Sequence, residues 1–178
     1  RSGGALQFRY NSGIASDGVR LVLADRGNNR VLIWHEAPSS NRPPDLVLGQ
    51  KDFDTNEEGA SRDKLNWPLS VATDGRRLVV ADANNDRLLI WNEFPTANGQ
   101  PADIEIAIQW PWGVWTDGER LVATSTSGGH ARVWTRFPTR DNEPPTFQLR
   151  ARGDFGTPRS ITSDGTYLII GDHNAKVS

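Results

Sequence analysis

The stretch RLVVADANNDRLLIW, residues 77–91, occurs in this chain in several closely related forms. RLVLADRGNNRVLIW begins at Arg20, RLVATSTSGGHARVW begins at Arg120, and a shorter relative, YLIIGDHNAKV, begins at Tyr167. Each form follows an Asp-Gly pair, and the first three continue without a gap to a tryptophan. Matches of this length at four places predict a repeat architecture, in which each copy is one structural unit.

One unit, residues 67–109, predicts four short strands. Asp74-Gly75 interrupts an apolar pattern, and glycine supplies the positive φ that a tight hairpin turn requires. A polar turn over residues 82–86 and a proline-rich segment over residues 95–101 mark two further breaks. The predicted strands are residues 70–73, 77–81, 87–91 and 103–108.

Runs such as RVLIW and RLLIW are apolar on both strand faces, which is typical of a sheet covered on both sides. Antiparallel sheets stacked radially provide such an environment. The sequence therefore predicts an all-β fold: a β-propeller of four-stranded antiparallel blades that forms a single domain over residues 1–178. The predicted blade units are residues 11–50, 67–109, 110–151 and 157–178.

Two linked motifs carry a family resemblance. The run L-V-V-A-D-x-x-N-x-R-L-x-x-W in residues 78–91, preceded by W-P-x-x-V-x-x-D-G in residues 67–75, resembles NHL-repeat β-propellers. The resemblance covers nearly the whole chain. It implies a whole of about six blades, of which about four are visible here and the last is incomplete. Since such propellers host many activities, it implies architecture rather than function.

Composition narrows the classes of partner. The formal net charge is −2, which disfavours the RNA binding that some NHL propellers perform through a basic face, so no nucleic-acid partner is predicted. No apolar run is long enough to predict membrane insertion. Cysteine is absent, so neither disulfides nor thiolate metal sites are expected. The compartment stays open, secreted and cell-surface locations included.

Residues at the start of each innermost strand are predicted to ring the mouth of the central channel. Trp67 and Trp110 precede prolines at this place, and Trp112 and Arg159 follow such prolines. Tryptophan and arginine can bind a ligand by stacking and by charge-assisted hydrogen bonds. Recurrence favours a packing role for Trp67 and Trp110. Trp112 and Arg159 are not shared between units, so packing and ligand binding are equally open for them.

The histidines invite a metal hypothesis, because three imidazoles can hold Zn²⁺ with an open coordination position. His35 is expected on the opposite face of the propeller from His130 and His173. The three imidazoles should therefore not converge, and no metal site is predicted. His130 and His173 lie on the same loop-rich face as the predicted channel mouth. They are therefore kept as candidate ligand-binding residues.

Carboxylates and arginines recur at fixed places in the units. Asp25, Asp82 and Asp172 each end a predicted second strand, and Arg30 and Arg87 follow the first two of them five residues later. This repetition favours structural ion pairs over metal ligands. The third unit carries Ser125 and His130 at the same two places.

These features favour a binding scaffold whose loop-rich face engages a protein, peptide or glycan. No catalytic residues are predicted, since the sequence contains neither a Gly-rich phosphate loop nor a G-x-S-x-G elbow. The alternative is a metal-dependent hydrolase or lyase with its site in the central channel. That reading needs carboxylate or amide ligands on innermost strands, where the sequence offers small, apolar and hydroxyl residues plus Trp115. No cofactor is predicted, while a divalent metal in the channel stays open.

Overall fold

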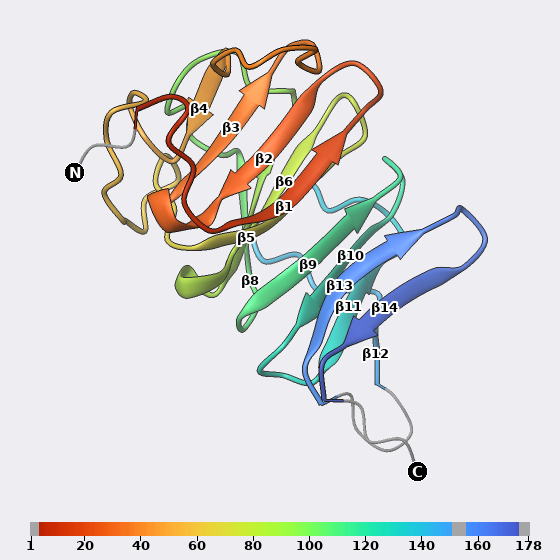
Figure 1. Ribbon diagram of the computed structural model, residues 1–178. Helices are drawn as coiled ribbons and strands as arrows, with labels where there is room; N and C mark the ends of the chain where they lie inside the picture. The colour runs from red at the N-terminus through yellow and green to blue at the C-terminus, as the bar shows by residue number, and fades with distance from the viewer. Residues whose placement is uncertain (1–3, 151–155, 175–178) are drawn as a thin grey trace.

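The computed structural model describes residues 4–150 and 156–174, and these fold into short antiparallel strands (Figure 1). Three consecutive groups of four strands each form one sheet, and two further strands pair as a hairpin. Blade 1 consists of β1 (Asn11–Ser16), β2 (Leu21–Asp25), β3 (Arg30–Trp34) and β4 (Leu46–Leu48). Blade 2 consists of β5 (Pro68–Thr73), β6 (Leu78–Asp82), β7 (Arg87–Trp91) and β8 (Ile104–Ala107). Blade 3 consists of β9 (Pro111–Thr116), β10 (Leu121–Ser125), β11 (His130–Trp134) and β12 (Phe147–Leu149), and blade 4 of β13 (Pro158–Ser163) and β14 (Leu168–Asp172).

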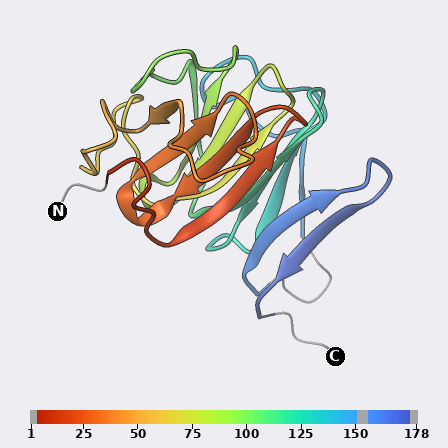
Figure 2. The same cartoon turned by 45° about the horizontal axis from the view of Figure 1, so that its top comes forward.

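The blades follow one another in chain order and stack face to face (Figures 1 and 2). The innermost strands β1, β5, β9 and β13 lie side by side along the stack. Blades 1 and 4 form its two ends, and blade 4 contributes a two-stranded hairpin among the described residues (Figure 2). This arrangement confirms the predicted all-β propeller. Residue 151 and residues 175–178 of the predicted blade units lie outside the described residues.

The strand limits differ slightly from those predicted. Strand β5 begins two residues earlier, at Pro68, because proline is tolerated at the first position of a strand, where no ladder hydrogen bond is lost. The predicted polar turn after β6 contains a short 3₁₀ helix, η2 (Ala83–Asn85), and blade 1 has the same feature in η1 (Arg26–Asn28). Each helix ends at a residue with left-handed backbone, Asn29 or Asp86. Asn and Asp tolerate this conformation better than other non-glycine residues.

Alternation along the middle strands builds the core between blades. In blade 2, Val80 and Leu89 belong to the apolar cluster shared with blade 1. Their neighbours Val79 and Ile90 belong to the cluster shared with blade 3. All four side chains are buried. The strands of blade 2 are apolar on both faces because neighbouring blades cover both faces.

The predicted ion pairs are present inside blades 1 and 2. The Nε atom of Arg30 donates to Oδ2 of Asp25 at 2.8 Å, and Nε of Arg87 donates to Oδ2 of Asp82 at 2.9 Å. All four side chains are buried, so each charge is compensated within its own blade. The structural interpretation of these carboxylates is confirmed by this geometry.

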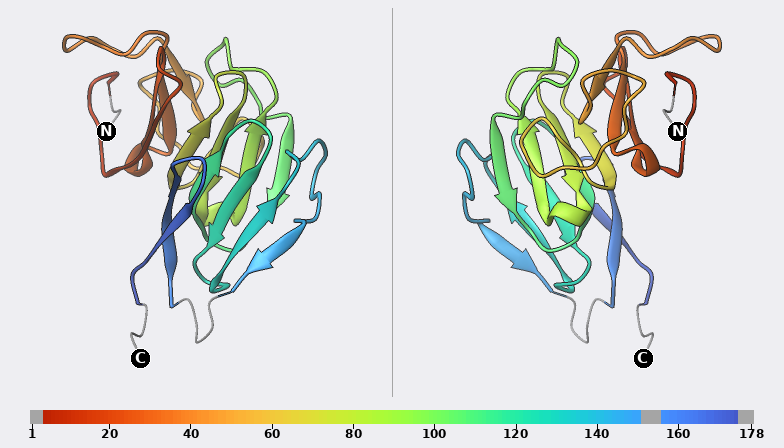
Figure 3. Two further views of the ribbon diagram at one scale, coloured as in Figure 1. Left: turned by 90° about the vertical axis from the view of Figure 1, so that its right-hand side faces the viewer. Right: turned by 90° about the vertical axis from the view of Figure 1, so that its left-hand side faces the viewer.

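The loops gather at two ends of the blades (Figure 3). We call the end with the Asp-Gly turns the hairpin end. The other end carries the β2–β3 turn of blade 1, its counterparts, and the segments that join one blade to the next. We call it the mouth end, because the innermost strands begin there.

Each Asp-Gly turn is organised by its aspartate. Burial alone would raise the pKa of Asp117, but the backbone N–H groups of Arg120 and Glu119 and the Arg120 guanidinium outweigh it and lower that pKa. The pKa of Asp164 is lowered by the backbone N–H groups of Tyr167 and Thr166. These carboxylates are therefore stabilised in their ionised form.

We expect this electrostatic stabilisation to disappear in acid. A carboxylate with a lowered pKa in the fold contributes stability above its unfolded pKa of about 4, and this contribution is lost as pH falls through the lower folded value. The melting temperature should therefore fall progressively between about pH 4 and pH 2. Thermal unfolding followed by circular dichroism measures this change. The Asp117→Asn variant should show a shallower decline, and an equal slope in both proteins would contradict the assignment to this turn.

Candidate ligand-binding site

The innermost strands line an open cavity of about 360 Å³. Serine and threonine hydroxyls are prominent in its lining, and the hydroxyls of Ser16, Thr73 and Thr116 each donate to a backbone carbonyl of their own hairpin. The described residues that line the cavity include no carboxylate and no imidazole. The hydroxyls thus serve the hairpins, and this cavity does not assemble an acid–base pair.

An aromatic residue precedes the innermost strand in each of the first three blades. Tyr10, Trp67 and Trp110 occupy equivalent places and all have positive φ, at 52°, 56° and 41°. Left-handed backbone is uncommon for bulky residues and is retained where the surroundings impose it. The backbone N–H of Trp67 donates to Oδ1 of Asn29 in the preceding blade, and that of Trp110 donates to Oδ1 of Asp86. The left-handed conformations of Trp67 and Trp110 are thus each held by the preceding blade.

These aromatic rings are not core residues. The side chain of Tyr10 is 64% exposed and that of Trp67 is 41% exposed, while Trp110 is half-buried. Their recurrence in the repeat predicts a packing role for Trp67 and Trp110. The structure instead places Trp67 at the surface of the mouth end, where its ring contacts an arginine. The guanidinium carbon of Arg26 lies 5.0 Å from the centroid of the Trp67 ring.

Trp112 and Arg159 are brought together by neighbouring blades. The guanidinium carbon of Arg159 lies 4.2 Å from the centroid of the Trp112 ring. At this distance the cation is attracted to the negative face of the ring. The Nε atom of Arg159 is buried and has no hydrogen-bond partner among the described residues. The pair therefore offers a ring and an unsatisfied donor at one place.

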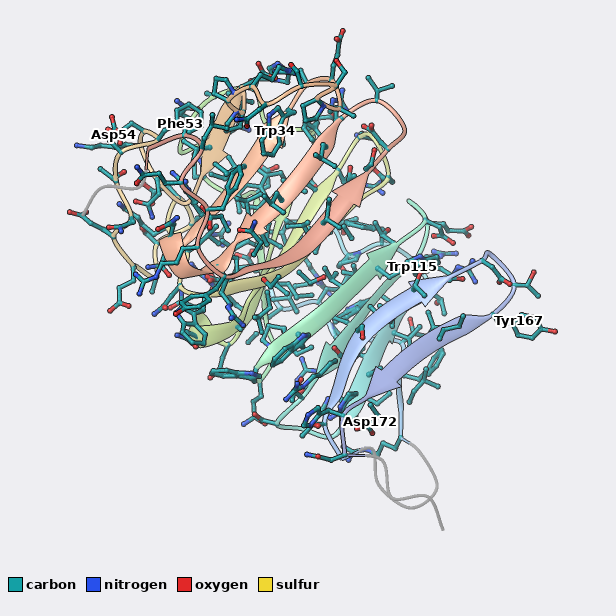
Figure 4. The ribbon with its side chains drawn as sticks, viewed as in Figure 1. Trp34, Phe53, Asp54, Trp115, Tyr167 and Asp172 are labelled. Carbon is teal, nitrogen blue, oxygen red and sulfur yellow. The ribbon has the colours of Figure 1, made fainter. Side chains whose placement is uncertain are left out.

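His173 lies beside this pair. A shallow cavity of about 240 Å³ is lined by Arg159, Ser160, Gly171, Asp172 and His173. Burial opposes ionisation of Asp172, but the backbone N–H groups of Thr157, Asn174 and Gly156 outweigh it and lower its pKa. Asp172 is therefore a fixed carboxylate that holds the start of blade 4. Figure 4 places it at the opposite end of blade 4 from Tyr167.

His130 lies elsewhere. Its side chain is buried inside blade 3, and its Nδ1 atom is 2.8 Å from the carbonyl oxygen of Gly128. It occupies the place that Arg30 and Arg87 hold in blades 1 and 2. His35 lies at the hairpin end, where its backbone N–H donates to Asp45. Within residues 4–150 and 156–174, no three His, Cys, Asp or Glu side chains are grouped so that they could hold a metal ion.

Sequence reasoning missed Tyr10, Arg26 and Arg9. The guanidinium carbons of Arg26 and Arg9 lie 5.7 Å and 5.6 Å from the centroid of the Tyr10 ring. The signal was present in the repeat, since Tyr10 precedes Asp17 by the same number of residues as Trp67 precedes Asp74. Arg26 directly follows the recurring aspartate.

Comparison with known proteins gives a likeness of fold. No family model and no curated protein matches the sequence. Among solved structures, the chain is similar to a streptogramin B lyase, with a TM-score of 0.58 and 12% identity over 96% of this chain and 49% of that one. It is also similar to a catalytically inactive variant of virginiamycin B lyase from Staphylococcus aureus with quinupristin, with a TM-score of 0.59 and 13% identity over 91% and 48%.

A third similar structure is hydrazine synthase from Kuenenia stuttgartiensis, with a TM-score of 0.56 and 17% identity over 95% of this chain and 42% of that one. The chain thus spans less than half the length of these three proteins. Within the part of the chain that the structure describes, no helix has the length and apolar character needed to cross a bilayer. Together, the blades and these likenesses show that this chain has the fold of a β-propeller.

Proposed function

We propose that this protein is a binding scaffold of NHL-type repeats that engages a protein, peptide or glycan at its mouth end. The observation that carries this proposal is the Trp112–Arg159 stack. Blades 1 and 2 have Ser12 and Leu69 at the same place, so the fold itself does not require this stack. A residue pair that departs from the repeat, with an unsatisfied buried donor, is better explained by a ligand than by packing.

The proposal predicts that the Trp112→Ala/Arg159→Ala double variant loses ligand affinity. Central aromatic and arginine residues carry most of the binding energy at interfaces, so we expect at least a tenfold loss, corresponding to about 1.4 kcal/mol. The ligand is first identified on glycan and peptide arrays, and its affinity is then measured by isothermal titration calorimetry. The matched control is Arg76→Ala/His35→Ala at the hairpin end. Unchanged affinity in the Trp112→Ala/Arg159→Ala variant would overturn the site assignment.

The second candidate function is a metal-dependent hydrolase or lyase with its site in the central channel. The cavity of about 360 Å³ between the innermost strands supports it, because a channel of this size accommodates a small substrate. Its hydroxyl lining is a poor set of ligands for a divalent metal. Elemental analysis of the purified protein separates the two candidates, since a stoichiometric bound metal would favour the enzyme.

A further inference from the structure

Arg26 lies between two aromatic rings that belong to neighbouring blades. Its guanidinium carbon is 5.7 Å from the ring centroid of Tyr10 in blade 1 and 5.0 Å from that of Trp67 in blade 2. Arg9 brings a second guanidinium to the Tyr10 ring, at 5.6 Å. We call these four residues the arginine cradle. It combines two cations with two ring faces at the mouth end.

Within the described part of the chain, the two arginines of the cradle have no acidic partner. Among the described residues, neither guanidinium takes part in a hydrogen bond or an ion pair, and the Nε atom of Arg26 is buried without a partner. Elsewhere in the fold, Arg20 and Arg77 also lie on aromatic rings, but each pairs with the aspartate of its own turn. A guanidinium that has no acidic partner keeps N–H donors of its terminal nitrogens for an external oxyanion.

The repeat indicates that Arg26 is not part of the scaffold. Ala83, Thr126 and His173 follow the end of the second strand in blades 2, 3 and 4, as Arg26 does in blade 1. Blade 2 therefore folds with alanine at this place. The ring contacts of Arg26 offset part of its desolvation but supply no counter-charge, so its presence in blade 1 points to an external anion.

Gly27 allows the cradle to form. A Cβ atom at this position would lie 2.6 Å from Cγ of Arg9 and 2.9 Å from Cδ2 of Tyr10. Blade 2 has Asn84 at the equivalent place. The missing side chain lets the segment before β1 press against the turn that carries Arg26. Both arginines are thereby brought to the same ring.

The exposure of the rings favours a sugar over a peptide side chain. The side chains of Tyr10 and Trp67 are 64% and 41% exposed, so they offer flat faces at the surface. Peptide anchors are side chains that become fully desolvated in pockets. A pyranose ring instead lays its C–H groups on an aromatic face, where their partial positive charge meets the negative π surface.

We infer that the arginine cradle binds the carboxylate of an acidic oligosaccharide, with a sugar ring against Trp67 or Tyr10. The inference rests on the proposed function and deepens it, because it names the ligand class. Arg26 supplies the planar donor edge, and Arg9 adds positive charge at the exposed side of Tyr10. Methyl esterification of the sugar acid removes the charge and keeps the ring, so it isolates the contribution of the carboxylate.

The test uses tetragalacturonate and its methyl ester as probes, with affinities measured by isothermal titration calorimetry at low salt. We expect the acid to bind at least about tenfold more tightly than the ester, as is typical for a charge-assisted pair. Arg26→Gln should remove most of the difference in affinity between acid and ester, with Arg9 retaining a small part, and should leave the affinity for the ester unchanged. Arg76→Gln makes the same change in net charge at the hairpin end and should leave both affinities unchanged.

Three results would overturn the inference. The first is equal binding of acid and ester, and the second is an unchanged affinity of Arg26→Gln for the acid. The third is that hexaglutamate binds more tightly than tetragalacturonate and loses its affinity in Arg26→Gln, which would assign the cradle to acidic peptides. The proposed function is judged separately with the array-identified ligand and the Trp112→Ala/Arg159→Ala variant, so its failure is distinguishable from failure of the cradle.

Discussion

Replacing Asp82 with alanine is expected to lower the free energy of unfolding by about 3 kcal/mol, because the change removes the buried carboxylate beside Arg87 and leaves that buried guanidinium with only the partly exposed Glu105 as an acidic partner. Asp82 accepts hydrogen bonds from Nε of Arg87 at 2.9 Å, from the backbone N–H of Asn66 at 2.7 Å and from Nδ2 of Asn85 at 2.7 Å. One carboxylate thus holds the turn, the third strand and the segment between blades 1 and 2. Urea denaturation followed by tryptophan fluorescence measures the loss.

Blade 3 supplies the control for this prediction. It has Ser125 and His130 where blade 2 has Asp82 and Arg87, and it folds without the ion pair. The double variant Asp82→Ser/Arg87→His should therefore be less destabilised than Asp82→Ala, because it removes both charges together. A loss in Asp82→Ala no larger than that of Glu93→Ala, which breaks an exposed ion pair, would contradict the prediction.

The propeller could be predicted from two independent features of the sequence. The recurring motif defines the repeat unit, and strands that are apolar on both faces indicate that the sheets stack against one another. Val79 and Val80 show why this works, since adjacent residues of one strand enter two different cores. The ends of the strands were predicted less well. They depend on the 3₁₀ turns and on Asn29 and Asp86 in left-handed conformation, which have no apolar pattern.

Candidate-site residues could be predicted only where a residue differs from its counterparts in the other units. Trp112 and Arg159 differ in this way and are in contact, in agreement with their shared position at the channel mouth. Tyr10 did not stand out, because blade 1 lacks the Trp-Pro pair that marks Trp67. The contact between Arg26 and the Trp67 ring depends on how blades 1 and 2 pack against each other. That relation is set by side-chain packing between blades, so no pattern within one unit reveals it.

The repeat also separates scaffold from site. Residues that recur and are buried, such as Asp25 with Arg30, maintain every blade that contains them. Residues that occupy equivalent positions but differ in chemistry between blades, such as Arg26, are not needed to maintain the blade structure. The place of Trp112 and Arg159 lies at the start of an innermost strand, and the place of Arg26 lies just after a second strand. Variation inside a repeat thus identifies the surface on which selection for a ligand can act.

Two classes of tryptophan illustrate this separation. Trp34, Trp91 and Trp134 end the third strand of their blades, and each donates its indole N–H to a backbone carbonyl of the following loop, at 3.2, 3.0 and 2.9 Å. Trp91 and Trp134 lie in the cores between blades. Trp34 lies in a smaller cluster on the outer face of blade 1, with Phe53 packed against it (Figure 4). Trp67 belongs to the other class, because its ring is exposed.

Trp91→Ala is accordingly expected to cost about 3–5 kcal/mol of unfolding free energy, since it removes a fully buried ring and its hydrogen bond from the interface of blades 1 and 2. Trp67→Ala should change stability by less than about 1 kcal/mol, yet weaken binding of the acidic oligosaccharide. Trp91→Phe keeps most of the buried surface and isolates the hydrogen bond to Gln100, so its loss should be intermediate. Urea denaturation of the three variants checks the order. Equal losses in Trp91→Ala and Trp67→Ala would mean that burial does not separate packing rings from binding rings, and would contradict the assignment of Trp67 to the binding surface.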